Sequence, residues 1–353
     1  MKPAPAPTAE QQLEFLQRIQ SLFEDGNFSA TYKYALLMAL AELAVELGAD
    51  NGNELPLEMA RIGDKFAELY WPQTVQYVSG VVGTLSEVLK QNHGAQAGAI
   101  NELLILREAG ANTLSKAKNL PNWTSVVRRI TETVRAMPIK HLQVLGGRQI
   151  PFLYEYPLPQ GKLVLKAGVA FNLRTFHGLI HQLARNGWIS HIRQIQYNRE
   201  IVGPTDDLEG FMFGTSRNSL QAISTVLAKM QSGRCFYCHE DIRAGGHVDH
   251  FIPWSRYPRD LAHNFVLAHT GCNSFKSDML AARVHLDNWV RRNERFGSEI
   301  AGSFGEAGFV GDEAGSRRVA SWAYGQAVTS GGIAWVEHKV TEPVSPAYLA
   351  VFT

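Results

Sequence analysis

Apolar residues recur every three or four positions along most of the first 140 residues, which predicts amphipathic helices. The predicted helices cover residues 13–23, 34–47, 57–70, 99–109 and 123–137. Several of them stop at residues that commonly end helices, such as Gly48, Pro72 and Pro138. The first region of the chain, residues 1–148, is therefore predicted to be a helical N-terminal region.

The hydrophobic pattern changes in the middle of the chain. Two short strands, at 149–156 and 162–166, are predicted to form a hairpin around residues 157–161. Two further helices are expected near 170–195 and 216–231. This second region, 149–231, would lead into a third region at 232–296.

The last region, 297–353, begins with glycines at irregular spacing. Such glycines predict a flexible loop, followed by a short helix at 316–327 and a strand at 333–340. The whole pattern predicts an α+β protein with a mainly helical N-terminal region and a small hairpin in the middle.

Composition and local charge narrow the class of protein. With 353 residues, 45% hydrophobic and 19% charged, the chain can bury a sizeable core, which excludes a disordered or collagenous protein. The net charge of +1 conceals an acidic stretch at 1–70, with eleven acidic against five basic residues. It also conceals a basic stretch at 107–148, with eight basic residues against two acidic ones.

These two stretches each have two interpretations. Arg128, Arg129 and Arg135 on one amphipathic helix could bind phosphates, or could be the solvated face of a surface helix. The acidic stretch could dock a partner protein, or could be a stable helical cap. The pattern does not predict an oligomeric state.

Because neither a secretory signal nor a membrane-spanning stretch is evident, we expect a cytoplasmic protein without a membrane partner. The Pro/Ala-rich N-terminus lacks the layout of a secretory signal. The most apolar stretch, 34–47, is interrupted by Glu42 and Glu46 and is too short to span a bilayer, so we expect a buried helix there.

Three cysteines indicate a metal site. Cys235 and Cys238 form a CxxC pair, and His269 and Cys272 repeat the same spacing further along. Four such ligands predict a closed, tetrahedral and structural zinc site. Other histidines compete with His269 for the fourth position: His239, His247 and His263. A thioredoxin-like redox CxxC would need an adjoining βαβ pattern, which is not evident.

A second set of side chains lies between the two cysteine pairs. Asp249 and Asn273 offer the hard oxygen donors that suit Mg²⁺ or Mn²⁺. His250 could take a proton from water, and Asn264 could accept a hydrogen bond from its other nitrogen. Because side chains alternate along a strand, Asp249 and His250 can serve one site only at a strand end or a distortion.

The segment from about 230 to 285 resembles an HNH endonuclease domain, the ββα-metal nuclease fold with a zinc-stapled hairpin. The positions that carry the resemblance are Cys235, Cys238, Asp249, His250, Asn264, Cys272, Asn273 and Lys276. It implies an HNH domain at 232–296, with His250 as general base, Asn264 as its orienting partner, and Asp249 and Asn273 as ligands of a catalytic Mg²⁺ or Mn²⁺. His269 stands where many members have a cysteine, and Asn273 with Lys276 stands where others have histidines.

The resemblance also implies an activity, the metal-dependent hydrolysis of DNA. A single active site would nick one strand and leave 5′-phosphate ends, and Lys276 could add positive charge at the scissile phosphate. Stand-alone proteins of this kind suggest a role in bacterial restriction or phage defence. Two alternatives stay open: a zinc-stabilised nucleic-acid-binding module without catalysis, and an RNA endonuclease.

Overall fold

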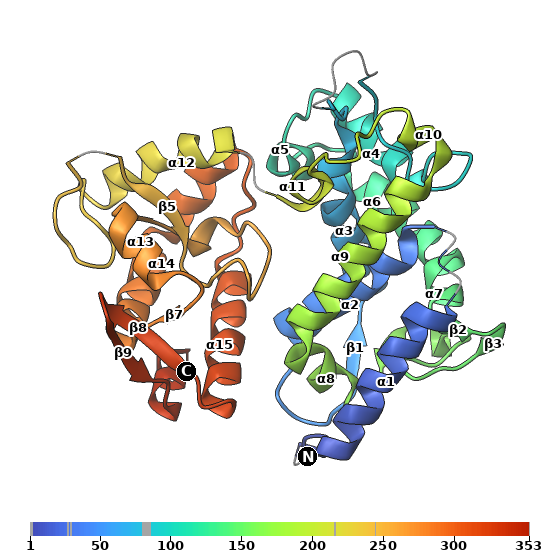
Figure 1. Cartoon of the computed structure of the whole chain (residues 1–353), viewed down its shortest axis with the longest axis horizontal. Helices are drawn as coiled ribbons and strands as arrows, with labels where there is room; N and C mark the ends of the chain where they lie inside the picture. Colours follow the sequence, from blue (N-terminus) through green and yellow to red (C-terminus); the bar gives the residue numbers. More distant parts are fainter. Residues whose placement is uncertain are drawn as a thin grey trace. The chain divides into compact units, whose positions relative to one another are not determined.

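The computed structural model describes residues 3–26, 28, 30–79, 86–214, 217–243 and 245–352. At 217–219 it describes the backbone alone. The chain divides into two compact units (Figure 1). Unit 1 consists of Met1–Asn112 and Asn119–Gly214, and unit 2 consists of Thr113–Lys118 and Thr215–Thr353. The four regions predicted from the sequence do not follow this division.

Unit 1 is mainly helical, as the hydrophobic pattern predicts. Its helices are α1 (Ala9–Asp25), α2 (Tyr32–Leu47), α3 (Met59–Tyr70), α4 (Gly98–Glu108), α6 (Trp123–Ala136), α7 (Pro138–His141), α8 (Val169–Thr175), α9 (His177–Gln194), α10 (Gln196–Arg199) and α11 (Leu208–Phe213), with 3-10 turns at η1 (Trp71–Thr74) and η2 (Pro159–Gly161). The first begins at Thr8, whose side chain accepts a hydrogen bond from the Gln11 backbone while the Gln11 side chain accepts one from Thr8.

Helix α2 is the central element of unit 1. It is apolar around most of its circumference, so it is buried on all sides and packs against α3, α8 and α9. The prediction of a buried helix at 34–47 is confirmed. Across the described residues, none of the helices has both the length and the apolar character needed to cross a membrane.

The predicted hairpin at 149–166 is wrong. Strand β4 (Leu163–Leu165) pairs with β1 (Leu55–Leu57), and β2 (Val144–Leu145) pairs with β3 (Arg148–Gln149). The buried side chain of Gln143 explains the difference, because it accepts from the Leu153 backbone and donates to the Tyr154 carbonyl. These are groups that a continuous strand ladder would use, and only a single bridge joins Tyr154 to Leu165.

Unit 2 mixes helices with small sheets. Its helices are α5 (Leu114–Lys118), α12 (Arg217–Met230), α13 (Thr270–Lys276), α14 (Arg283–Glu306) and α15 (Glu313–Thr329), with 3-10 turns at η3 (Ala262–Asn264) and η4 (Pro346–Phe352). Its strands are β5 (His247–His250), β6 (Phe265–Ala268), β7 (Leu280–Ala281), β8 (Ile333–Glu337) and β9 (Val340–Pro343). The predicted helix start at residue 216 lies outside the described residues.

The order of β5, β6 and α13 gives two antiparallel strands followed by a helix. Asp249 lies opposite Val266, and His250 lies opposite Phe265. The hairpin packs on an apolar cluster from α12, α14 and their neighbours, which includes Leu227 and Phe304. A second sheet, in the order β7-β8-β9, completes the strands of unit 2.

The predicted flexible loop from residue 297 is wrong, because α14 continues as a helix to Glu306. Two glycines of this stretch, Gly297 in the helix and Gly308 just after it, allow close packing. A Cβ atom at Gly297 would lie 2.2 Å from Glu313 Oε2, and one at Gly308 would lie 2.7 Å from Thr113 Cγ2. Gly308, just after the helix, also has a φ of +100°, which favours glycine.

Candidate metal centre and the adjoining strand end

Four candidate metal ligands converge at the base of the β5–β6 hairpin. Cys235 and Cys238 lie in the loop between α12 and β5, His269 lies immediately before α13, and Cys272 lies in its first turn. Their ligand atoms all lie within 4.8 Å of one another. The sequence prediction that His269 joins the three cysteines agrees with this geometry.

Backbone hydrogen bonds shape the first ligand loop. The Cys235 amide donates to the Glu240 carbonyl at 2.9 Å, and the His239 amide donates to the Cys235 carbonyl at 3.0 Å. His239 has a φ of +62°, so it turns the chain back after Cys238. The His269 amide then donates to Cys235 Sγ at 3.3 Å, which joins the two ligand pairs.

The donor set suits a tetrahedral cation. With Zn–S bonds of about 2.3 Å, neighbouring ligand atoms lie about 3.8 Å apart, which fits a cluster of this size. The competing His263 is buried and donates instead to the Gly297 carbonyl at 3.0 Å. The cluster could therefore hold a metal such as zinc.

The pKa values of two thiols in this cluster are raised. Burial raises the pKa of Cys238, and burial together with Cys235 and Cys238 raises the pKa of Cys272 to about 12. Without a cation the Cys272 thiol would keep its proton at neutral pH. A bound divalent metal would offset the charge of the thiolates.

Asp249 lies on one face of β5, in a buried polar cluster. Its Oδ2 accepts from the Tyr237 hydroxyl at 2.5 Å and lies 3.0 Å from Lys276 Nζ. Lys276 also donates to the His250 carbonyl at 3.0 Å. Burial and the neighbouring Asp249 raise the pKa of Tyr237 well above its usual value, so Tyr237 remains a neutral donor.

This contradicts the prediction that Lys276 is a cation available to a DNA phosphate. The Lys276 side chain is 0% exposed, and its ammonium group already neutralises Asp249. Sequence reasoning also missed Tyr237. Its position inside the CxxC loop was the only signal for it.

His250 lies on the other face of β5. Its Nε2 is 2.9 Å from Asp260 Oδ1, and its ring packs against Trp254 and Phe265. An Nε2–H that donates to Asp260 fixes one tautomer and leaves Nδ1 as the acceptor. Within the described part of the chain, Nδ1 makes no hydrogen bond.

The prediction that Asn264 orients His250 is wrong. The Asn264 side chain accepts from the Ile252 amide at 2.7 Å and donates to the Ile252 carbonyl at 2.9 Å. Its own carbonyl accepts from the Phe251 amide at 2.8 Å. Asn264 thus fixes the chain that leaves β5, while Asp260, which the sequence did not reveal, holds His250.

Asn273 lies on α13, three residues before Lys276, and is half-buried. Positions three apart share a helix face, so Asn273 is on the side of α13 from which Lys276 reaches Asp249. The structure therefore brings α13 to the Asp249 face of β5, whereas His250 lies on the opposite face.

The three predicted phosphate-binding arginines lie on α6 in unit 1. Arg129 forms an ion pair with Glu102 at 2.6 Å, so it is already paired. Arg128 and Arg135 are exposed and seven positions apart, which places them on one helix face.

Part of the acidic N-terminal stretch is buried in the interior of unit 1. Lys65 Nζ lies 3.5, 2.6 and 3.3 Å from carboxylate oxygens of Glu42, Glu46 and Glu68, all with little exposure. These three acids contribute to the net charge of residues 1–70. They do not contribute to an exposed acidic surface that could dock a partner.

A family model matches residues 12–209, more than half of the chain, and is described as a domain of unknown function, DUF8808. The chain belongs to this family. No curated protein and no solved structure matches the chain. The DUF8808 match ends before Cys235, so the candidate metal centre lies outside it.

Proposed function

We propose that the chain is a metal-dependent HNH endonuclease that hydrolyses DNA phosphodiester bonds. The observation that supports this most strongly is His250 at the end of β5, held by Asp260 within a hairpin-and-helix unit. The four-ligand cluster at the base of the β5–β6 hairpin supports the proposal further. As a single active site, it would nick one strand and leave 5′-phosphate ends.

In this proposal His250 is the general base. Asp260 accepts from Nε2–H, so the lone pair on Nδ1 is free to take a proton from the attacking water. Asp260 thus takes the orienting role that the resemblance gave to Asn264. Asn264 would act indirectly, because its side chain fixes the backbone of Ile252, two residues after His250.

Asp249 and Asn273 would hold the catalytic Mg²⁺ or Mn²⁺, since both offer hard oxygen donors from adjoining elements. Such an ion would supply a Lewis acid for the charge that develops on the phosphate. The Lys276 ammonium, 3.0 Å from Asp249, is a competing cation that must give way. Asp249 keeps the hydrogen bond from Tyr237 in either case.

The Cys₃His cluster is proposed to be a structural zinc site. Four protein ligands complete a tetrahedron and leave no open position for a substrate. The metal would fix the loop before β5 to the start of α13. By the same resemblance, we propose a role in bacterial phage defence or restriction, in the cytoplasm.

The Asp249–Lys276 pair favours one alternative, a zinc-stabilised nucleic-acid-binding module without catalysis. A buried lysine that permanently neutralises Asp249 would leave no carboxylate charge for a divalent ion. The two functions differ in whether the protein turns over a substrate.

The test is cleavage of supercoiled plasmid with Mg²⁺, Mn²⁺ or EDTA. We expect divalent-dependent conversion to open circle, and a loss of about 100-fold or more with His250→Ala. The matched control is His247→Ala, which removes an exposed histidine from the same strand and should leave the rate unchanged.

Other outcomes overturn the proposal in distinct ways. Binding of DNA without cleavage of DNA or RNA, in protein with one zinc per chain, identifies the binding module. Cleavage of RNA alone replaces the substrate. Equal nicking by the His250→Ala variant would show that His250 is not the base.

A further inference from the structure

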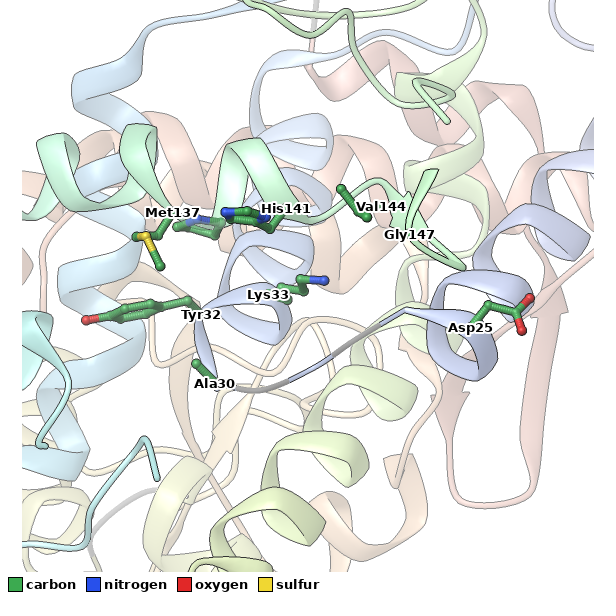
Figure 2. A pocket seen from close by; sticks show the side chains of 9 residues that line it. Asp25, Ala30, Tyr32, Lys33, Met137, His141, Val144 and Gly147 are labelled. Atoms are coloured by element: carbon green, nitrogen blue, oxygen red, sulfur yellow. The ribbon is translucent and has the colours of Figure 1, made fainter. Parts of the chain in front are cut away.

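Unit 1 contains a pocket that is separate from the candidate metal centre. It has a volume of about 420 Å³ and lies among the end of α1, the start of α2, α7 and the turn between β2 and β3 (Figure 2). This volume falls within the range of sites that hold small organic molecules.

Lys33, in the first turn of α2, supplies a buried positive charge to this pocket. The residue is 8% exposed and its side chain lines the pocket, with the nitrogen directed toward the side where Gly147 and Asp25 lie (Figure 2). Among the described residues it forms no ion pair, and its ammonium nitrogen lies 5.2 Å from the centre of the Phe28 ring. Burial lowers the pKa of Lys33 to about 8.

The start of α2 adds to the positive potential. Thr31 precedes the helix but does not cap it, because its hydroxyl pairs with the Tyr70 hydroxyl at 2.6 Å. The first amides of the helix are therefore not satisfied by a capping side chain. A positive charge near the N-terminus of a helix is unfavourable, because that end of the helix dipole is also positive. A bound anion would interact favourably with both the Lys33 ammonium and the helix N-terminus.

The other polar groups around the pocket do not neutralise Lys33. Asp25 is exposed at the rim, and among the described residues it forms no ion pair with Lys33. Burial, together with Lys140 and Lys33, lowers the pKa of His141 below its usual value. Its ring therefore adds no charge to the pocket at neutral pH. It can accept or donate a hydrogen bond.

The remaining walls are largely apolar. Tyr32, Met137, Pro138 and Val144 line the pocket beside the charged group. An apolar lining with one buried charge suits a ligand that has an apolar body and one anionic group.

We propose that this pocket binds a small organic anion, whose carboxylate or phosphate group pairs with Lys33 and whose apolar body lies against Met137, Pro138 and Val144. This site lies within the range matched by the family model and does not depend on the nuclease proposal.

Isothermal titration calorimetry with the full-length protein tests the site. The probes are phenyl phosphate, benzoate and inorganic phosphate, which separate the anionic group from the apolar body. We expect phenyl phosphate or benzoate to bind more tightly than inorganic phosphate. Lys33→Met should weaken that binding about tenfold or more, because the charge-assisted contact is lost.

Lys140→Met is the matched control. It removes the same charge from an exposed lysine next to His141 that does not line the pocket, and it should preserve binding. Circular dichroism checks that each variant is folded. If no probe binds the native protein, or if Lys33→Met and Lys140→Met weaken binding equally, the proposal is overturned.

Discussion

At the scale of single residues, the Lys276–Asp249 pair makes a prediction about stability. Lys276→Met leaves the nearly buried Asp249 carboxylate without its cation. Breaking such a pair costs about 3 kcal/mol, so we expect the free energy of unfolding of unit 2 to fall by about that amount. Urea unfolding measures it.

The double variant Lys276→Met, Asp249→Asn should recover part of this loss, because no buried charge then remains unpaired. Arg18→Met is the control, since the Arg18–Glu14 pair is exposed. It should change the stability by less than about 1 kcal/mol. A Lys276→Met variant as stable as the native protein would contradict the buried pair.

Lys33 gives a prediction about pH. Its folded-state pKa of about 8 lies below the unfolded value of about 10.4, so the unfolded chain binds more protons between these values. Below pH 8 the buried charge of Lys33 lowers the free energy of unfolding by its full amount. This destabilisation disappears as the pH rises through the window between the two pKa values. Lys33→Met should therefore stabilise the protein most near pH 7 and least near pH 10. Urea midpoints of both proteins measure this, and a pH-independent difference would contradict it.

The sequence could predict the metal ligands but not the partners of the adjoining residues. Two repeated spacings, CxxC and HxxC, place four ligands without further knowledge of the fold. Asp260 and Tyr237 are different, because their contacts with His250 and Asp249 depend on how a loop returns to β5. Asn264 is predicted to accept from His250, both by its chemistry and by the resemblance, yet backbone groups of Ile252 satisfy its side chain.

At the scale of elements, the β5–β6 hairpin and α13 are predicted to depend on the proposed zinc ion. The four ligands join the loop before β5 to the start of α13, so a chelator should remove this restraint. We expect the backbone amides of these elements to lose protection against hydrogen exchange, while α2 keeps its protection. Mass spectrometry with and without EDTA measures both.

A pair of variants separates ligation from a general effect of losing a histidine. His269→Ala should lose the bound metal and show the same loss of protection without chelator. His247→Ala, which removes an exposed histidine outside the cluster, should keep one metal per chain. Metal retention by His269→Ala would show that it is not a ligand.

Helices were predicted better than strands for a physical reason. An amphipathic helix such as α3 or α6 records its buried face locally, in residues three and four apart. The pairing of β4 with β1 joins segments more than one hundred residues apart, which no local pattern contains. Irregular glycines predict a flexible loop, whereas Gly297 in α14 and Gly308 just after it permit close contacts with Glu313 and Thr113.

At the scale of the whole molecule, the basic and acidic stretches did not define the units. The boundary at Gly214 falls inside the predicted region 149–231, and no composition change marks it. The division follows from which segments pack together. Arg128 and Arg135 belong to unit 1, whereas the candidate metal centre belongs to unit 2.

Helix α5 gives the chain an interleaved topology. Thr113–Lys118 belongs to unit 2, although the chain on both sides of it belongs to unit 1, so the backbone passes between the units three times. No single cut separates them into two intact fragments. A gene truncated after Gly214 would encode unit 1 together with α5, but without α14, against which α5 packs. The complementary fragment would lack α5. Both units are therefore expected to be complete only when they are made as one continuous chain.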